Sequence, residues 1–133
     1  MTIEEAIQAL LLATPGVVAL TGPRIRVPGD QHSVERPYIV HFVVACAPTQ
    51  THKGQAALME WTYQVSCFSE SYKQARELGI LVREAIAGIH QAGSPPVSLT
   101  GFWVQMMHQY ESEPGEVGIH HVAEQLTVFA DLE

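Results

Sequence analysis

Seven histidines are the residues of this 133-residue chain with the clearest potential for metal or acid–base chemistry. His120 and His121 are adjacent, so on a strand they point to opposite faces and cannot bind one metal ion together. His41 and His108 fall on separate predicted strands and could meet in space, but no Asp, Glu or Cys stands at a ligand spacing beside them. We therefore predict strand and surface histidines, with no metal site and no cofactor.

This sequence contains none of the usual patterns of nucleophilic catalysis. There is no Gly-x-Ser-x-Gly segment, and neither Cys46 nor Cys67 has a base beside it. Ser69 and Ser71 precede a predicted helix, where side-chain hydroxyls commonly cap the first amides. The glycines that could bind a phosphate stand beside prolines or in loops, as turn residues do. These residues predict a protein that is not an enzyme.

Acidic residues crowd one turn-rich segment near the C-terminus, which contains Glu111, Glu113 and Glu116. They could bind a cation, but they show no regular ligand register, so a solvated negative hairpin tip explains them better. Trp61 and Trp103 could stack on nucleic-acid bases, but no Arg or Lys is interleaved with them. Packing in the core or at an interface is the better explanation for both indoles.

The composition limits the classes of partner. The formal net charge is −7, and the seven Lys and Arg residues are scattered, which argues against non-specific nucleic-acid binding. Hydrophobic residues make up 47%, as in globular proteins, but charged residues only 16%, which favours a subunit over a solitary monomer. No apolar run is long enough to predict a membrane span, and the N-terminus does not resemble a secretory signal. Two cysteines make no disulfide framework, so we expect a reducing cytoplasm and two small apolar strand residues.

The apolar spacing predicts two helices. Thr2 and Glu5 form a capping-box pattern before an apolar stripe that runs to Leu11, and Thr14-Pro15-Gly16 stops this helix. After Val17–Leu20, a loop region rich in Gly and Pro runs from Gly22 to Pro37, with a short strand at 24–27. Ser71 and Gln74 repeat the capping pattern before a longer helix over residues 72–89.

Strand patterns fill the rest of the chain. Residues 38–46 are apolar on both faces, as in a central strand or a strand at a subunit contact, and residues 58–68 alternate as in a half-buried strand. A polar connection at 48–57 joins these two strands. Two further strands follow, with 111–118 as their hairpin tip. One face of the first is predicted to carry Phe102, Val104, Met106, His108 and Tyr110.

The order of the elements predicts the fold class. We expect one α+β domain over residues 1–133, in the order α-β-β-β-α-β-β. Its sheet is antiparallel or mixed, with about four to five strands, and two helices pack on it.

The order and spacing of several segments together resemble a known family. These segments are Ile3–Leu11, Pro15–Leu20 with Gly22, Arg36–Val40, Trp61–Phe68, Ser69–Tyr72, and the apolar positions of the second helix up to Ile86. Over residues 3–90, and more loosely in the final hairpin, the chain resembles the small tail-terminator, or tail-completion, proteins of long-tailed bacteriophages and prophages.

This resemblance implies a structural protein without enzymatic activity. Such proteins form a ring, usually of six subunits, that caps the tail tube and joins it to the head–tail connector. The implied partners are other copies of the chain, the tail tube protein and the connector protein. DNA passes through the channel without sequence-specific binding, and no membrane is involved. The implied location is the bacterial host cytoplasm during assembly and then the virion tail.

Two loops are candidates for the ring interface or the lumen, and a third for docking a partner. Each could equally be an ordinary solvated loop. The lumen or interface candidates are His52, Lys53, Gln55, Glu111, Glu113 and Glu116, and the docking candidates are Arg24, Arg26 and Arg36.

Two other interpretations stay open from the residues alone. One is a small dimeric α+β enzyme or ligand-binding protein with a pocket near His41, Trp61 and His108. The other is an adaptor that binds a partner strand along an exposed sheet edge.

Overall fold

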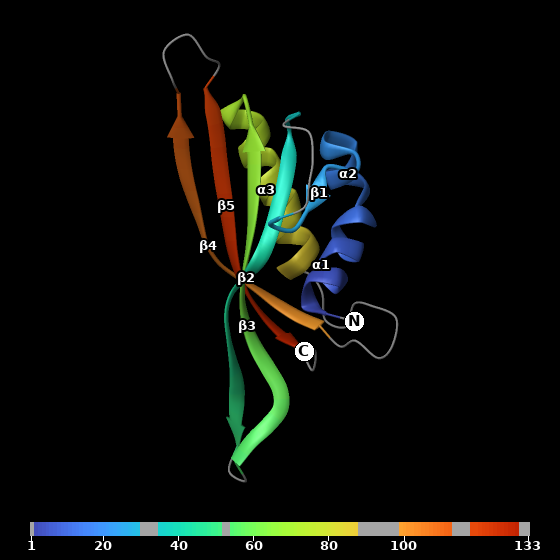
Figure 1. Ribbon diagram of the computed structural model, residues 1–133, viewed down its shortest axis with the longest axis vertical. Coiled ribbons are helices and arrows are strands. Elements are labelled where there is room, and N and C mark those ends of the chain that lie inside the picture. Colours follow the sequence, from blue (N-terminus) through green and yellow to red (C-terminus); the bar gives the residue numbers. More distant parts are fainter. Residues whose placement is uncertain (1, 30–34, 52–53, 88–98, 113–117, 131–133) are drawn as a thin grey trace.

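The computed structural model describes residues 2–29, 35–51, 54–87, 99–112 and 118–130. Three helices and five strands follow one another along the chain (Figure 1). They are α1 (Ile3–Leu12), α2 (Pro15–Thr21), β1 (Ile25–Arg26), β2 (Tyr38–Thr51), β3 (Gly54–Ser69), α3 (Tyr72–Ala87), β4 (Leu99–Glu111) and β5 (Ile119–Ala130). The predicted α+β class and element order are confirmed, with one short helix more than expected.

The extra helix is α2, which begins at the predicted stop and covers Val17–Leu20, a segment for which no helix or strand was predicted. Helix α1 begins as predicted, with the Thr2 hydroxyl oxygen accepting a hydrogen bond from the Glu5 amide at 3.2 Å. Pro15 then follows α1 and is the first residue of α2. A proline tolerates this position because the first amides of a helix have no intrahelical partner. The proline therefore ends one helix and begins the next.

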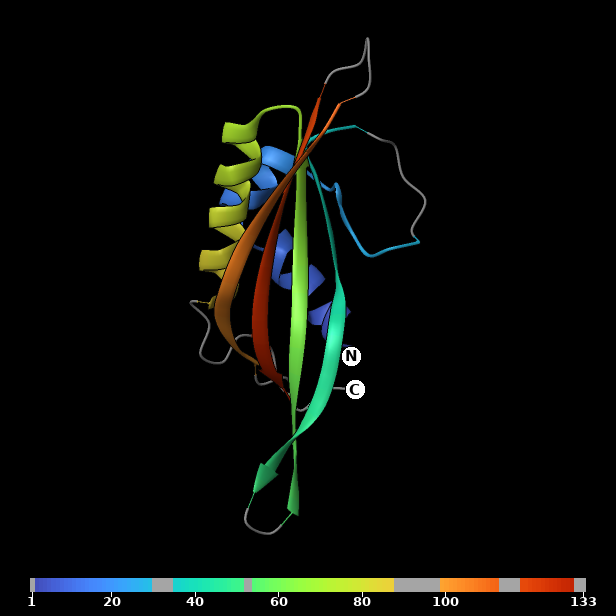
Figure 2. The same ribbon diagram turned by 90° about the vertical axis from the view of Figure 1, so that its left-hand side faces the viewer.

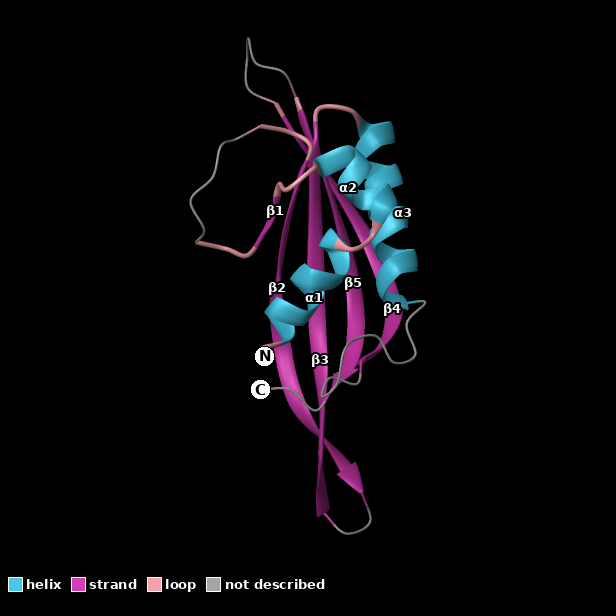
Figure 3. Ribbon diagram, turned by 90° about the vertical axis from the view of Figure 1, so that its right-hand side faces the viewer, coloured by secondary structure: helices cyan, strands magenta, loops and turns pink. Residues whose placement is uncertain are grey.

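The sheet is mixed, with strand order β1-β2-β3-β5-β4. Strand β1 pairs in parallel with β2, where Ile25 lies opposite Ile39, and every other pair is antiparallel. All three helices lie against one face of this sheet (Figures 2 and 3). Helix α1 contacts β1 and β2, α3 contacts β3, β5 and β4, and α2 contacts the other two helices.

The core lies between the helices and this face of the sheet. Burying each large apolar side chain contributes roughly 1.5–3 kcal/mol, so this layer supplies most of the driving force for folding. The predicted alternation along β3 is confirmed, because its apolar side chains point to the helices. The core includes Ile3, Ile7, Leu11, Val17, Ile39, Trp61, Tyr63, Val65, Cys67, Leu78, Val82, Leu126 and Val128.

The predicted polar connection at 48–57 is wrong, because both strands continue through most of it. Strands β2 and β3 keep pairing as far as Thr51 opposite Gly54, with an irregularity between Pro48 and Gln50. Their paired ends project beyond the helices as a two-stranded arm (Figure 1). Polar residues and a proline are compatible with an exposed strand at the edge of a sheet, so local polarity was no reason to expect a loop.

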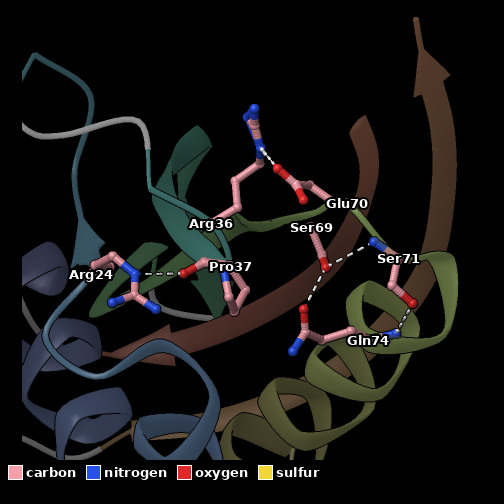
Figure 4. A network of polar contacts seen from close by, with 7 residues as sticks. All are labelled: Arg24, Arg36, Pro37, Ser69, Glu70, Ser71 and Gln74. Carbon is pink, nitrogen blue, oxygen red and sulfur yellow. Dashed lines mark hydrogen bonds and ion pairs between the residues drawn. The ribbon is translucent and has the colours of Figure 1, made fainter. Parts of the chain in front are cut away.

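Helix α3 begins with serine caps, as the sequence predicts, but the second capping box is rearranged. The Ser71 hydroxyl accepts from the Gln74 amide at 3.4 Å, while the Gln74 side chain accepts from the Ser69 hydroxyl at 2.6 Å (Figure 4). Ser69 is buried and its hydroxyl also accepts from the Ser71 amide.

No single helix in the described part of the chain is long and apolar enough to cross a membrane. Helices α1 and α2 meet that test only together, by length and composition, and they are bent by 84° at their junction.

Candidate assembly surface

One face of the sheet has no helix on it, and we call it the open face. Because side chains alternate along a strand, the neighbours of the core residues of β3 and β5 point to this face. The registers place the corresponding residues of β4 beside them. The open face of these three strands is formed by Thr62, Gln64, Ser66, Phe68, His121, Ala123, Gln125, Thr127, Phe102, Gln105, Met107 and Gln109.

A row of glutamines crosses the middle of the open face. Gln64 lies opposite Gln125, and Gln125 lies opposite Gln105. The Gln105 amide nitrogen donates to the Gln125 side-chain oxygen at 2.6 Å, and that of Gln64 donates to the Ser66 hydroxyl at 3.0 Å. The row therefore offers hydrogen-bonding groups to a partner without offering charge.

A small hollow lies beside this row. Its volume is about 240 Å³, and its lining includes Gln64, Gln109 and His121. The His121 ring is stacked on Phe68 at 4.4 Å, and its buried Nε2 has no hydrogen-bond partner among the described residues. Burial lowers the pKa of His121, which the nearby Glu111 carboxylate partly opposes. The lowered pKa favours the neutral form of the imidazole. His121 is therefore biased toward being uncharged, as the neighbouring glutamines are.

Strand β4 forms one edge of the sheet and is exposed on both faces. Its large apolar side chains keep between 42% and 55% of their surface accessible. No charged residue occurs in it before Glu111. The exposed side chains are Phe102, Trp103, Val104, Met107 and Tyr110. A long, uncharged edge strand of this kind is a typical site for pairing with another chain.

A bulge at Val104 corrects the predicted face of β4. Trp103 lies opposite Leu126, but Gln105 already lies opposite Gln125, so one residue is extra. As a result Phe102 points to the open face, while Met106, His108 and Tyr110 share the helix side with Trp103. The prediction of a single shared face was wrong because strict alternation fails at a bulge.

The opposite edge of the sheet is formed by β2, because β1 covers only Ile39 and Val40. Val44 sits at a second bulge, and residues 44–47 are all exposed. Both cysteines lie in strands, as expected, but Cys46 is exposed at this edge while Cys67 is buried in β3.

A larger hollow of about 630 Å³ lies beside this edge of β2, next to the N-terminal end of α1. Apolar residues including Val27, Phe42 and Val43 line it, together with Glu4 and Glu5. The uncovered part of β2 therefore borders on free space with a largely apolar wall.

The histidines do not converge as one interpretation required. His41 is buried on β2, with Nδ1 2.5 Å from the Tyr63 hydroxyl and Nε2 2.6 Å from the Gln8 side-chain oxygen. Because that amide oxygen only accepts, Nε2 carries the proton and Nδ1 accepts from Tyr63. The Gln8 amide nitrogen donates in turn to the Ile25 carbonyl at 2.7 Å. This network attaches α1 to β1 and β2.

His108 lies on β4, across the sheet from that network, and its Nε2 is 3.0 Å from Nδ1 of His120. Two strands separate β4 from β2, so His41 and His108 do not meet as the enzyme interpretation required. Trp61 is opposite Val128, whereas His108 is opposite Val122. The two hollows described above, and a third beside Tyr72 and Leu81 on α3, are not lined by His41, Trp61 or His108. Among the described residues, no group of three or more His, Cys, Asp or Glu could hold a metal ion.

Comparison with known proteins decides the family. Residues 5–129 match the family model described as tail completion protein gp17. The chain belongs to this family. One chain of a solved structure, the virion of a native gene transfer agent (GTA) particle, has the same fold with a TM-score of 0.78. The two chains are 12% identical over 97% of this chain and 94% of that chain, and a search of curated proteins gave no match.

The resemblance to tail-completion proteins is therefore confirmed, and the chain is a structural protein of the phage tail. The surfaces described above are therefore candidates for contact with other proteins of the tail.

Several of the predicted contact residues of this tail-completion protein lie outside the described residues. These are His52, Lys53, Glu113 and Glu116. Gln55 lies on β3 at the arm, opposite Gln50, and Glu111 is exposed at the end of β4. Their assignment to a lumen or ring interface remains a prediction.

The three predicted docking arginines all make contacts within the chain, and Figure 4 shows those of Arg24 and Arg36. Arg24 donates from Nε to the Pro37 carbonyl at 2.9 Å, and Arg36 lies 3.8 Å from the Glu70 carboxylate. The guanidinium of Arg26 lies over the Tyr38 ring at 5.3 Å. Their role in docking remains a prediction, but each has a structural role as well.

Sequence reasoning missed the two bulges and the open edges. No residue pattern marks Val44 or Val104 as extra residues, because both look like ordinary strand valines. Gly79 did carry a signal, since a glycine inside a helix often marks a close approach. An added Cβ there would lie 2.9 Å from both the Glu124 and Val122 side chains.

Proposed function

We propose that this chain assembles with other copies into a ring that closes the phage tail tube and joins it to the head–tail connector. DNA passes through the channel of the ring during ejection. The ring contains about six copies, and assembly takes place in the cytoplasm of the bacterial host. The family membership supports the tail role, and the observation that carries the ring is the exposed apolar edge strand β4.

That edge is poorly suited to a protein that works alone. Among the described residues, five of the eight large hydrophobic side chains that are exposed lie on β4. Monomeric proteins usually protect such edges with lysines, prolines or very short strands. A tail-completion subunit that buries this strand against a neighbour needs no such protection.

The open face supports the proposed channel. Strands β3, β4 and β5 contain no Lys or Arg, and the centre of their open face is a row of glutamines. DNA affinity comes chiefly from lysine and arginine contacts with phosphate groups, so a wall of this kind would not retain DNA. The net charge of −7 acts in the same direction.

The proposal is tested by the mass of the protein in solution, alone and with purified tail tubes. We expect a species of about six subunit masses, or ring density at the tube end when tubes are added. Particles that lack the protein should contain separate heads and tails, which the wild-type chain should join. A chain that stays monomeric with tubes and heads, and whose loss leaves joined particles, would refute the proposal.

A further inference from the structure

We propose that the ring closes by pairing of sheet edges, with β4 of one copy added in an antiparallel arrangement to β2 of the next copy. The partner is therefore a second copy of this chain. This inference rests on the proposed ring and specifies which surfaces join its subunits.

The chemistry of β4 provides the first argument. No described strand pairs with its outer side, and the exposed Phe102, Trp103 and Val104 surround this edge with apolar surface. The bulge at Val104 would ordinarily discourage pairing, but here it presents an apolar side chain that is 50% exposed. Burial of these side chains against another strand stabilises the contact at roughly 25 cal/mol per Å².

The second argument comes from β2. Beyond Val40 it has no strand neighbour on its outer side in the described part of the chain, and residues 44–47 are exposed and uncharged. Pro48 has no amide hydrogen to donate, so it limits the pairing segment. The hollow of about 630 Å³ beside Phe42 and Val43 gives room for large side chains of an added strand.

Strand direction provides the third argument. From β2 to β4 the sheet contains three antiparallel steps, so these two edges run in opposite directions. If the copies are related by rotation about an axis that runs along the strands, a given strand points the same way in every copy. Edge β4 of one copy then meets edge β2 of the next in the antiparallel arrangement used throughout the sheet.

Two different edges on one chain are also what a closed ring requires. A ring is built from head-to-tail contacts in which each copy uses both surfaces once. The two edges match in lacking charge, so the pairing involves no repulsion between like charges. A strand from a different protein would satisfy only one edge and leave the other exposed.

The native thiol of Cys46 allows a direct test. Single cysteines are introduced on β4 at Val104, Met106 and His108, because Met106 and His108 share the helix side of the sheet with Cys46, and rings or tube-bound rings are treated with a short bismaleimide. We expect covalent ladders that end at the ring size, and only from one or two neighbouring positions. The same variants carrying Cys46→Ser should give no ladder. Cys67 does not interfere, because it is fully buried.

Charge substitutions test the same contact without cross-linking. Val104→Lys and Val44→Lys should each abolish the ring while leaving the circular dichroism and melting temperature of the subunit close to wild type. Leu12→Lys is the matched control, since Leu12 is 44% exposed on α1 and away from both edges. Its rings should form with wild-type yield.

The outcomes separate the two proposals. If rings of the β4 cysteine variants give no ladder with Cys46, and rings still form with Val104→Lys, edge pairing is overturned and the ring remains. Cross-links from β4 to the tail tube protein, and not to Cys46, would overturn the second copy as the partner. Absence of any ring, even with tubes, would refute the proposed function and this inference with it.

Discussion

The indole Nε1 of Trp103 donates a hydrogen bond of 2.6 Å to Oε2 of Glu124, and this bond joins the edge strand β4 to β5. Glu124 is fully buried beneath α3, and its other oxygen has no hydrogen-bond partner among the described residues. The guanidinium of Arg83 lies over the Trp103 ring at 4.5 Å. The edge strand β4 and helix α3 are therefore attached to the rest of the sheet by a buried carboxyl, an indole and an arginine.

Burial raises the pKa of Glu124, although Trp103, Arg83 and Arg76 act in the opposite direction. Below the ordinary glutamate pKa of about 4.3 the carboxyl is neutral in both states. Between this value and the higher pKa of the folded state, the folded chain still holds a proton that the unfolded chain has released. The free energy of unfolding therefore falls with rising pH across this window.

Glu124→Gln should remove this contribution, because glutamine stays neutral and can still accept from Trp103. Urea unfolding across pH about 4 to about 8 should show the variant gaining stability relative to wild type as the pH rises. Glu77→Gln, on the exposed side of α3, is the control. A difference between Glu124→Gln and wild type that does not vary with pH would contradict the prediction.

Two glycines allow close approaches that alanine should disrupt. At Gly79 an added Cβ would lie 2.9 Å from Glu124 and Val122, so Gly79→Ala should cost about 1–3 kcal/mol despite the better helix propensity of alanine. At Gly101 the added Cβ would lie 2.5 Å from the Ile86 carbonyl oxygen, and backbone yields less easily than a side chain. Gly101→Ala should therefore cost more.

Gly16→Ala is the control for both variants, because its Cβ would meet only the end of the Leu81 side chain, at 3.2 Å. Denaturant midpoints of the three variants should fall in the order Gly16, Gly79, Gly101, from most to least stable. Equal midpoints would argue against the close packing of α3 on the sheet.

The Tyr63 hydroxyl should stabilise the fold through His41. Tyr63→Phe leaves the buried Nδ1 of His41 without its donor, which should cost about 1–3 kcal/mol. Tyr72→Phe makes the same change on a side chain that is 45% exposed, and should cost less than about 0.5 kcal/mol. Equal melting temperatures for the two variants would show that the Tyr63 hydroxyl contributes nothing.

The two cysteines should differ in reactivity. Cys46 is exposed, while burial and the neighbouring Glu124 raise the pKa of the Cys67 thiol and so disfavour the reactive thiolate. A chromogenic thiol reagent should therefore react quickly with one thiol in the native chain and with both in denaturant. Cys46→Ser should abolish the fast reaction. Rapid labelling of Cys67 in the native state would show that β3 is less protected than its burial indicates.

Ser69 should matter more than Ser71 at the start of α3. The Ser69 hydroxyl is buried and joins the Gln74 side chain to the Ser71 amide, whereas the Ser71 cap is a longer contact of 3.4 Å near the surface. Ser69→Ala should cost about 1–2 kcal/mol and Ser71→Ala about 0.5 kcal/mol, as judged by thermal unfolding. The reverse order would show that the helix cap outweighs the buried hydrogen bonds.

Much of the fold follows from local patterns in the sequence. The apolar stripe from Ile3 to Leu11, the alternation from Trp61 to Cys67, and the serines before Tyr72 predicted elements that the structure contains. These patterns are readable because the spacing of apolar residues and the caps depend on neighbours within a few positions.

The assembly surface could not be read in the same way. Whether Val104 is a bulge, whether β2 is covered beyond Val40, and whether Glu124 is buried all depend on strands distant in sequence. His41 and His108 looked equivalent as strand histidines, yet the strand order places one in the core and the other near an edge. The spacing of apolar residues and their polarity are local properties of the sequence. Sheet edges, strand registers and burial are set by pairing between distant segments, so only the packed sheet determines them.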